Sequence, residues 1–127
     1  MKKLFALGFI FLLFADLLPA QTELLTRAES SGFLSTSDYK DVMSFINSLN
    51  KLSDKISVDI IAESVNGMSV PLIIIGDPLP DDTGLASEDK RIVIYIQANI
   101  HAGEVEGKEA SLMFARDLLL GKDQSLL

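Results

Sequence analysis

Apolar residues recur every three or four positions between Asp38 and Lys51, which is the period of a helix that buries one face. The preceding stretch, Ser35 to Asp38, offers hydroxyl and acidic side chains of the kind that cap helix N-termini. We therefore predict a helix over residues 38–51. Its apolar stripe consists of Tyr39, Val42, Met43, Ile46, Leu49 and Leu52.

A period of two replaces this helical period after residue 55. Apolar and polar residues alternate from Ile56 to Ile60, as in a half-buried strand. Asn66-Gly67 is a tight-turn signal, and Val70 to Ile75 is apolar enough for a second strand. Pro71 cannot donate a ladder hydrogen bond, so this strand should begin at a sheet edge or before regular pairing. We predict a β-hairpin here.

A polar loop, Gly76 to Lys90, separates this hairpin from a run of successive apolar residues. That run, within Arg91 to Asn99, predicts a third strand that lies inside the sheet with helices on both faces. Val105 to Leu120 then has a helical period, and Gly121 is a typical stop signal. The stripe of this second helix contains Leu112, Ala115 and Leu119.

This order of elements predicts an α/β fold, with a layered mixed β-sheet and flanking helices. A sheet whose most buried strand is its third normally continues with further strands. We therefore expect an incomplete fold, in which residues 21–127 form the front part of a longer protein.

Residues 1–20 have the three parts of a signal peptide: a basic start at Lys2 and Lys3, an apolar run from Leu4 to Ala15, and a cleavage site ending at Ala20. The apolar run is shorter than the roughly 20 residues that span a bilayer. We expect a secreted or periplasmic protein with no stable membrane span after cleavage. The alternative is an uncleaved membrane anchor.

Charge and cysteine content exclude several function classes. Cleavage after Ala20 leaves 107 residues and changes the formal charge from −7 to −8. Such an acidic chain is a poor nucleic-acid binder, because that affinity comes from basic side chains on phosphates. The chain has no cysteine. Disulfides, cysteine-ligated metal sites and thiol catalysis are therefore excluded.

Candidate chemistry lies at the end of the predicted third strand. His101, the only histidine, is followed three residues later by Glu104. Imidazole nitrogen and carboxylate oxygen are zinc ligands, and a turn of this length brings two side chains together. The alternative is a structural histidine that hydrogen-bonds a neighbouring carboxylate. Glu106 and Glu109 are expected to be exposed or helix-start charges.

The stretch from Asn99 to Gly107, NIHAGEVEG, resembles the first zinc-binding motif of the carboxypeptidase A-like zinc carboxypeptidases. The similarity covers residues 33–120 and is specific around residues 97–110. It implies that His101 and Glu104 are two of three protein ligands to Zn²⁺. In that family the third ligand is a downstream histidine, which has no counterpart here. The substrate-binding arginines and the general-base glutamate are likewise unmatched, and Arg116 is expected to be a solvated helix residue.

The resemblance implies that residues 21–127 are the N-terminal part of a zinc carboxypeptidase-like catalytic domain. The expected function is zinc-dependent hydrolysis of peptide bonds, with His101 and Glu104 as metal ligands and no catalytic acid or base in this chain. We expect the chain to be inactive alone. The alternatives are a zinc deacylase or amidase acting on acyl-amino acids, an exported metal-free binding domain, and a truncated product without function.

Overall fold

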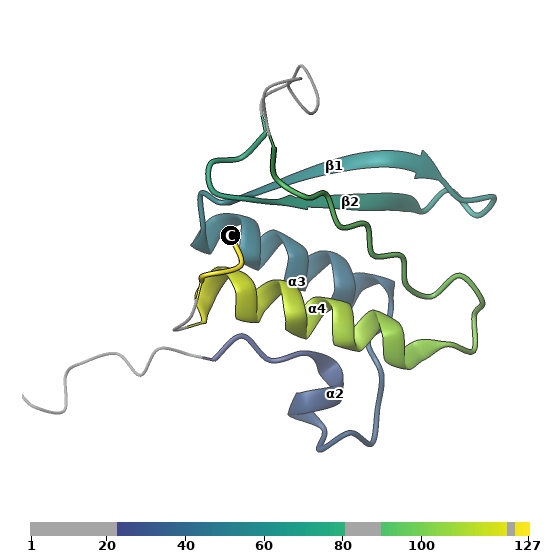
Figure 1. Ribbon diagram of the computed structural model, residues 1–127. Helices are drawn as coiled ribbons and strands as arrows, with labels where there is room; N and C mark the ends of the chain where they lie inside the picture. Colours follow the sequence, from purple (N-terminus) through teal and green to yellow (C-terminus); the bar gives the residue numbers. More distant parts are fainter. Residues whose placement is uncertain (1–22, 81–89, 122–123) are drawn as a thin grey trace, which may run out of the picture.

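The computed structural model describes residues 23–80, 90–121 and 124–127. The elements in chain order are α2 (Arg27–Ser30), α3 (Tyr39–Leu52), β1 (Ile56–Glu63), β2 (Ser69–Ile75) and α4 (Val105–Leu120). The β1–β2 hairpin forms one layer, α3 and α4 lie side by side beneath it, and α2 lies on the side of these two helices that faces away from the hairpin (Figure 1). The predicted signal peptide, residues 1–20, lies outside the described residues.

Helix α3 matches its prediction closely, and the reason is its cap. The Asp38 side chain accepts a hydrogen bond from the Asp41 amide at 2.9 Å, and the Asp41 side chain accepts one from the Asp38 amide at 3.1 Å. This reciprocal capping box satisfies amide groups that have no partner within the helix. Acidic groups also interact favourably with the positive end of the helix dipole.

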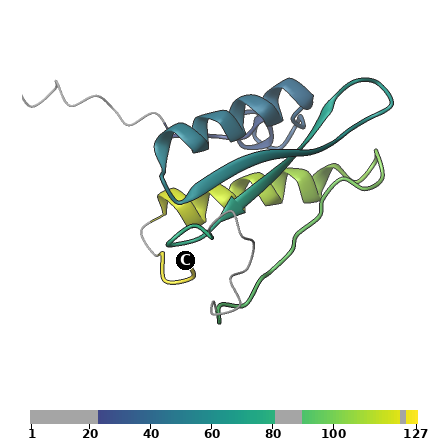
Figure 2. The ribbon, with the colours of Figure 1, turned by 90° about the horizontal axis from the view of Figure 1, so that it is seen from above.

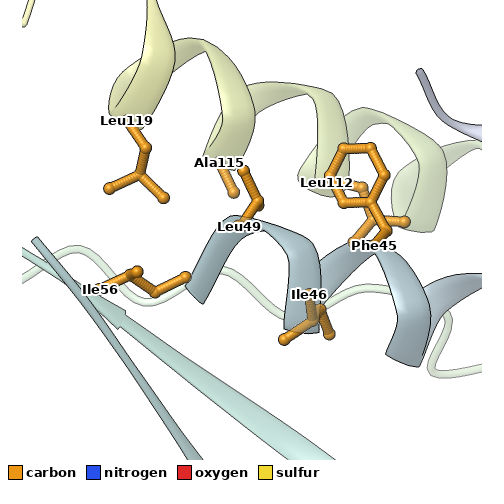
Figure 3. Packing of buried hydrophobic residues seen from close by; sticks show 7 residues of the cluster. All are labelled: Phe45, Ile46, Leu49, Ile56, Leu112, Ala115 and Leu119. Atoms are coloured by element: carbon orange, nitrogen blue, oxygen red, sulfur yellow. The ribbon is translucent and has the colours of Figure 1, made fainter. Parts of the chain in front are cut away.

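One apolar cluster joins α3, α4 and β1. It contains Phe45, Ile46, Leu49, Ile56, Leu112, Ala115 and Leu119. Figure 3 shows the side chains of α4 pointing toward those of α3, with Ile56 of β1 closing one end. The predicted stripe of α4 is buried as expected, whereas Phe45 of α3 was not predicted. Phe45 lies one turn before Leu49 and therefore faces α4 with it.

The β1–β2 hairpin is antiparallel, with Ile56 opposite Ile75 and Ile60 opposite Pro71. The register shifts between Ile60 and Ala62, so the bulge lies opposite the proline. Because proline cannot donate to the ladder, a bulge is one of the few sheet positions that accept it. In the turn, Gly67 has a φ of 72°, a conformation that glycine adopts without steric cost.

The predicted third strand is not formed. Residues 91–99 have no regular secondary structure, and the sheet in the described part of the chain contains β1 and β2 alone. Figure 2 shows this segment running apart from the hairpin before it reaches α4. Ile92 is 89% exposed and Ile94 is 79% exposed, so burial with helices on both faces is also wrong. The apolar pattern expresses strand preference, but a strand forms only beside a neighbour that accepts its hydrogen bonds.

The α/β composition is therefore confirmed, while the sheet described is antiparallel instead of mixed and its helices lie on one face. Helix α4 has the predicted bounds, and Gly121 is its C-cap. Helix α2 was not predicted, although Thr26 and Glu29 have capping-box spacing and form both of its hydrogen bonds. Within the described ranges, no helix is long and apolar enough to cross a membrane.

Replacing Leu49, which is 0% exposed, by alanine should lower the free energy of unfolding by about 2–5 kcal/mol, because it removes contacts and leaves a cavity. The matched control is Leu52→Ala in the same helix, where the side chain is 59% exposed and the expected change is within about 0.5 kcal/mol. Urea unfolding of both variants measures the difference. Equal losses would contradict the assignment of Leu49 to the core.

Candidate metal site

A short turn connects the irregular segment 91–99 to α4 and presents the His-x-x-Glu pair. Asn99 enters this turn with a φ of 58°, in the left-handed region that asparagine tolerates better than most residues. The amide of Glu104 then donates to the carbonyl of His101 at 3.0 Å, which closes the turn immediately before α4 begins at Val105. Glu104 is the N-cap residue of α4, so its carboxylate is attached directly at the start of the helix.

The side chains of His101 and Glu104 meet across this turn. Imidazole Nδ1 lies 2.8 Å from carboxylate Oε1. The His101 side chain is 78% exposed and the Glu104 side chain 58% exposed, so both are open to a ligand from solvent. The contact is a hydrogen bond when Nδ1 carries the ring proton, because a carboxylate only accepts hydrogen bonds.

These two donors fit a zinc ion in chemistry and spacing. Zinc bonds of about 2.0–2.1 Å in tetrahedral geometry place neighbouring donor atoms about 3.3 Å apart. The observed 2.8 Å differs from that separation by an amount that exposed side chains can accommodate. No group of three His, Cys, Asp or Glu side chains suited to a metal occurs among the residues that the structure describes. His101 and Glu104 therefore supply at most two of the three or four protein ligands that a zinc site has.

The other two glutamates of the motif region differ from one another. Glu106 lies in the first turn of α4 and is exposed, as expected. Glu109 is only 5% exposed, so the expectation of a solvated or helix-start charge was wrong for it. Its carboxylate points away from solvent because four hydrogen-bond donors surround it.

The donors to Glu109 come from the segment before α3 and from α2. Oε1 accepts from the Ser37 amide at 2.5 Å and from the Thr36 hydroxyl at 2.8 Å. Oε2 accepts from the Ser37 hydroxyl at 3.1 Å and from the Ala28 amide at 3.4 Å. Lys108 donates to the Ser37 carbonyl. We call these contacts of Lys108 and Glu109 with Ala28, Thr36 and Ser37 the Glu109 clamp.

The hydrogen bonds of the clamp decide the ionisation of Glu109. Burial by itself raises the pKa of a carboxyl group, because it disfavours the charged form. The hydrogen bonds from Ser37, Thr36 and Ala28 outweigh burial and hold the pKa of Glu109 below its ordinary value. Glu109 is therefore a buried carboxylate at neutral pH.

Arg116 forms a second polar connection between α4 and the N-terminal segment. Its side chain is 12% exposed, so the expectation of a solvated residue was wrong. Nη1 lies 2.7 Å from Oε2 of Glu29 and donates to the carbonyl of Leu24 at 3.0 Å. Burial opposes the charged forms, but the hydrogen bonds between the two side chains lower the pKa of Glu29 and raise that of Arg116.

Among the comparisons with known proteins, one found a match, which is to a family model. The family model for zinc carboxypeptidase matches residues 42–126, which contain most of α3 together with the hairpin, the His-x-x-Glu turn and α4. The chain belongs to the zinc carboxypeptidase family. The match is to part of the family's domain. No curated protein and no solved structure matches the chain.

Glu109→Gln should lower the free energy of unfolding by about 1–3 kcal/mol at neutral pH, because it removes a charged acceptor of buried hydrogen bonds. A folded pKa below the ordinary value of 4.5 means that the carboxylate stabilises the fold above that pH, and that this contribution is lost as pH falls through the folded pKa. The difference between wild type and variant should therefore shrink below pH 4.5.

Urea unfolding of both proteins along a pH series measures this difference, and the titration of Glu29 cancels because both proteins contain it. Glu106→Gln, an exposed position on the same helix, is the control and should change stability by less than about 0.5 kcal/mol. A Glu109→Gln effect that stays constant from neutral pH to well below 4.5 would show that the charge of Glu109 is not its source.

Proposed function

We propose that this chain contributes His101 and Glu104 as two zinc ligands to a metallocarboxypeptidase that hydrolyses peptide bonds. The single observation that carries the proposal is the 2.8 Å contact between Nδ1 of His101 and Oε1 of Glu104, within the stretch that matches the zinc carboxypeptidase family. The contact brings a nitrogen and an oxygen donor to one exposed point.

When bound, zinc polarises a carbonyl and lowers the pKa of a bound water to about 7, which provides a nucleophile at neutral pH. The residues of this chain hold the metal and leave the chemistry of proton transfer to other groups. His101 and Glu104 are ligands, so neither is free to act as general acid or base. Ala102 and Gly103 between them carry no side chain large enough to obstruct a peptide that approaches the site.

A third ligand and a general base are needed for catalysis, and no residue of this chain matches the family's groups for those roles. The chain contains one histidine, so a second imidazole ligand cannot come from it. We therefore propose that the chain alone binds zinc weakly and does not remove C-terminal residues from peptides. The proposed substrates of the complete site are peptides.

We also propose that the protein is exported, on the strength of residues 1–20. Their basic start, apolar run and small-residue cleavage site have the layout of a signal peptide. Zinc hydrolases need no reducing environment, and a chain without cysteine is indifferent to an oxidising one.

Isothermal titration of the full chain with zinc tests the metal assignment. We expect weak binding to one site, and His101→Ala should reduce the affinity by more than the roughly 10–100-fold that loss of an outer partner costs a metal site. Glu106→Ala is the matched control, because Glu106 is an exposed carboxylate two residues after Glu104 and should not change the affinity. Equal binding by wild type and His101→Ala, or no binding by either, would contradict the proposal and favour a metal-free binding domain.

A further inference from the structure

Among the described residues, α4 is attached to the rest of the protein in two different ways along its length. Its buried residues are Glu109, Leu112, Ala115 and Leu119. The last three pack in the apolar cluster, so the C-terminal part of α4 is held by apolar contact. Glu109 is the buried residue nearest to the His-x-x-Glu turn, and its contacts are polar. The end of α4 that presents Glu104 is therefore positioned chiefly by the Glu109 clamp.

The Glu109 clamp fixes the orientation of α4, which apolar packing alone does not. Hydrophobic burial is non-directional and tolerates a helix that slides or rotates slightly. Hydrogen bonds weaken steeply as their angles depart from linear. Glu109 accepts four of them, from two amides and two hydroxyls on three residues. Lys108 binds the carbonyl of Ser37 while Glu109 binds the amide and hydroxyl of the same residue. Rotation and translation of α4 are both restricted at this point.

A small rotation would matter at the metal pair. Glu104 precedes Glu109 by five residues, or about 7.5 Å along the helix axis at 1.5 Å per residue. Side-chain tips lie about 5–6 Å from that axis, so a rotation of about 20° moves them by roughly 2 Å. A functional site requires its groups to be held within about 0.5 Å. His101 and Glu104 are exposed, and neither has packing of its own that would correct such a shift.

We propose that Glu109 is a positioning residue for the His101–Glu104 pair. Through the clamp it fixes the first turns of α4 against the residues that precede α3, and it thereby holds the Glu104 carboxylate in reach of the His101 imidazole. This inference rests on the proposed function in one respect, namely that His101 and Glu104 bind a metal. The positioning itself is a property of the metal-free protein and can be measured there.

The matched control is the ion pair of Glu29 with Arg116. It joins the same helix to the same N-terminal segment, but Arg116 lies seven residues further from the turn than Glu109. Glu29→Gln therefore weakens the same connection at a contact further along α4, while glutamine still suits the capping box of α2. A comparison of Glu109→Gln with Glu29→Gln separates positioning from general stability.

Since His101 is the only histidine, the ring protons of the full chain give a single set of NMR signals that report on the site directly. In the metal-free protein we expect a nuclear Overhauser effect between the His101 ring and the Glu104 side chain. It should persist in Glu29→Gln and be lost in Glu109→Gln. Zinc titration followed by the same ring signals should give roughly tenfold weaker binding in Glu109→Gln and unchanged binding in Glu29→Gln.

Three results would overturn the positioning role. The nuclear Overhauser effect between His101 and Glu104 could survive in Glu109→Gln, it could be lost equally in Glu109→Gln and Glu29→Gln, or it could be absent from the wild type. If the wild type binds no zinc but the effect is lost only in Glu109→Gln, the metal assignment fails and the positioning role stands. If zinc binds equally to wild type and Glu109→Gln and the nuclear Overhauser effect is intact in both, the positioning role fails and the metal assignment stands.

Thr36→Val decides the matter if Glu109→Gln does not fold. The Thr36 hydroxyl donates to Oε1 of Glu109 at 2.8 Å, and valine has nearly the same shape without the donor. The variant should weaken the ring-to-Glu104 effect in the same direction as Glu109→Gln, with a smaller change. An unaltered effect in Thr36→Val would overturn the proposal.

Discussion

Burial of the Glu109 carboxylate ties α4 to segments far away in the sequence. An ionised group away from water must have hydrogen-bond donors around it, and here they come from Ala28, Thr36 and Ser37. These donors lie 72 to 81 residues earlier in the chain. The N-terminal segment can therefore adopt its observed path only when α4 is in place, and α4 can bury its carboxylate only against that segment.

Two kinds of contact hold the described part of the protein together. The apolar cluster joins α3, α4 and the hairpin, while the Glu109 clamp and the Glu29–Arg116 pair join α4 to the segment before α3. They respond differently to conditions, because hydrophobic burial weakens on cooling and the carboxylate contacts are lost in acid. The His101–Glu104 pair lies at the end of α4 where the polar connection dominates. The proposed positioning role makes the geometry of this pair depend on Glu109, which is not one of the two proposed ligands.

Much of the fold could be predicted from local pattern, and the failures have physical reasons. The periods that predicted α3, the hairpin and α4 reflect which face of each element is buried. Thr26 and Glu29 already had the spacing of a capping box, so α2 was visible in the sequence. The burial of Glu109 could not be seen, because it depends on donors far away in the chain. Residues 91–99 have strand preference, but preference does not supply a neighbouring strand.

The site could be predicted in part. The spacing of His101 and Glu104 indicated that their side chains would meet, and they do so at 2.8 Å. Their role as zinc ligands stays a prediction. Arg116 could not be predicted correctly, because a charged side chain late in an amphipathic helix is usually solvated. Here the carboxylate of Glu29, remote in sequence, draws it into a partly buried ion pair.

The exposed apolar segment from Ile92 to Ile96 has a consequence for how the protein behaves at high concentration. Five successive apolar residues without charge or proline have the composition of templates for cross-β assembly. Chains that meet along this segment can form strand pairing that residues 91–99 do not have in the described structure. Mutual repulsion, from a formal net charge of −7, opposes the encounter. Salt screens that repulsion, so colloidal stability should decline as ionic strength rises.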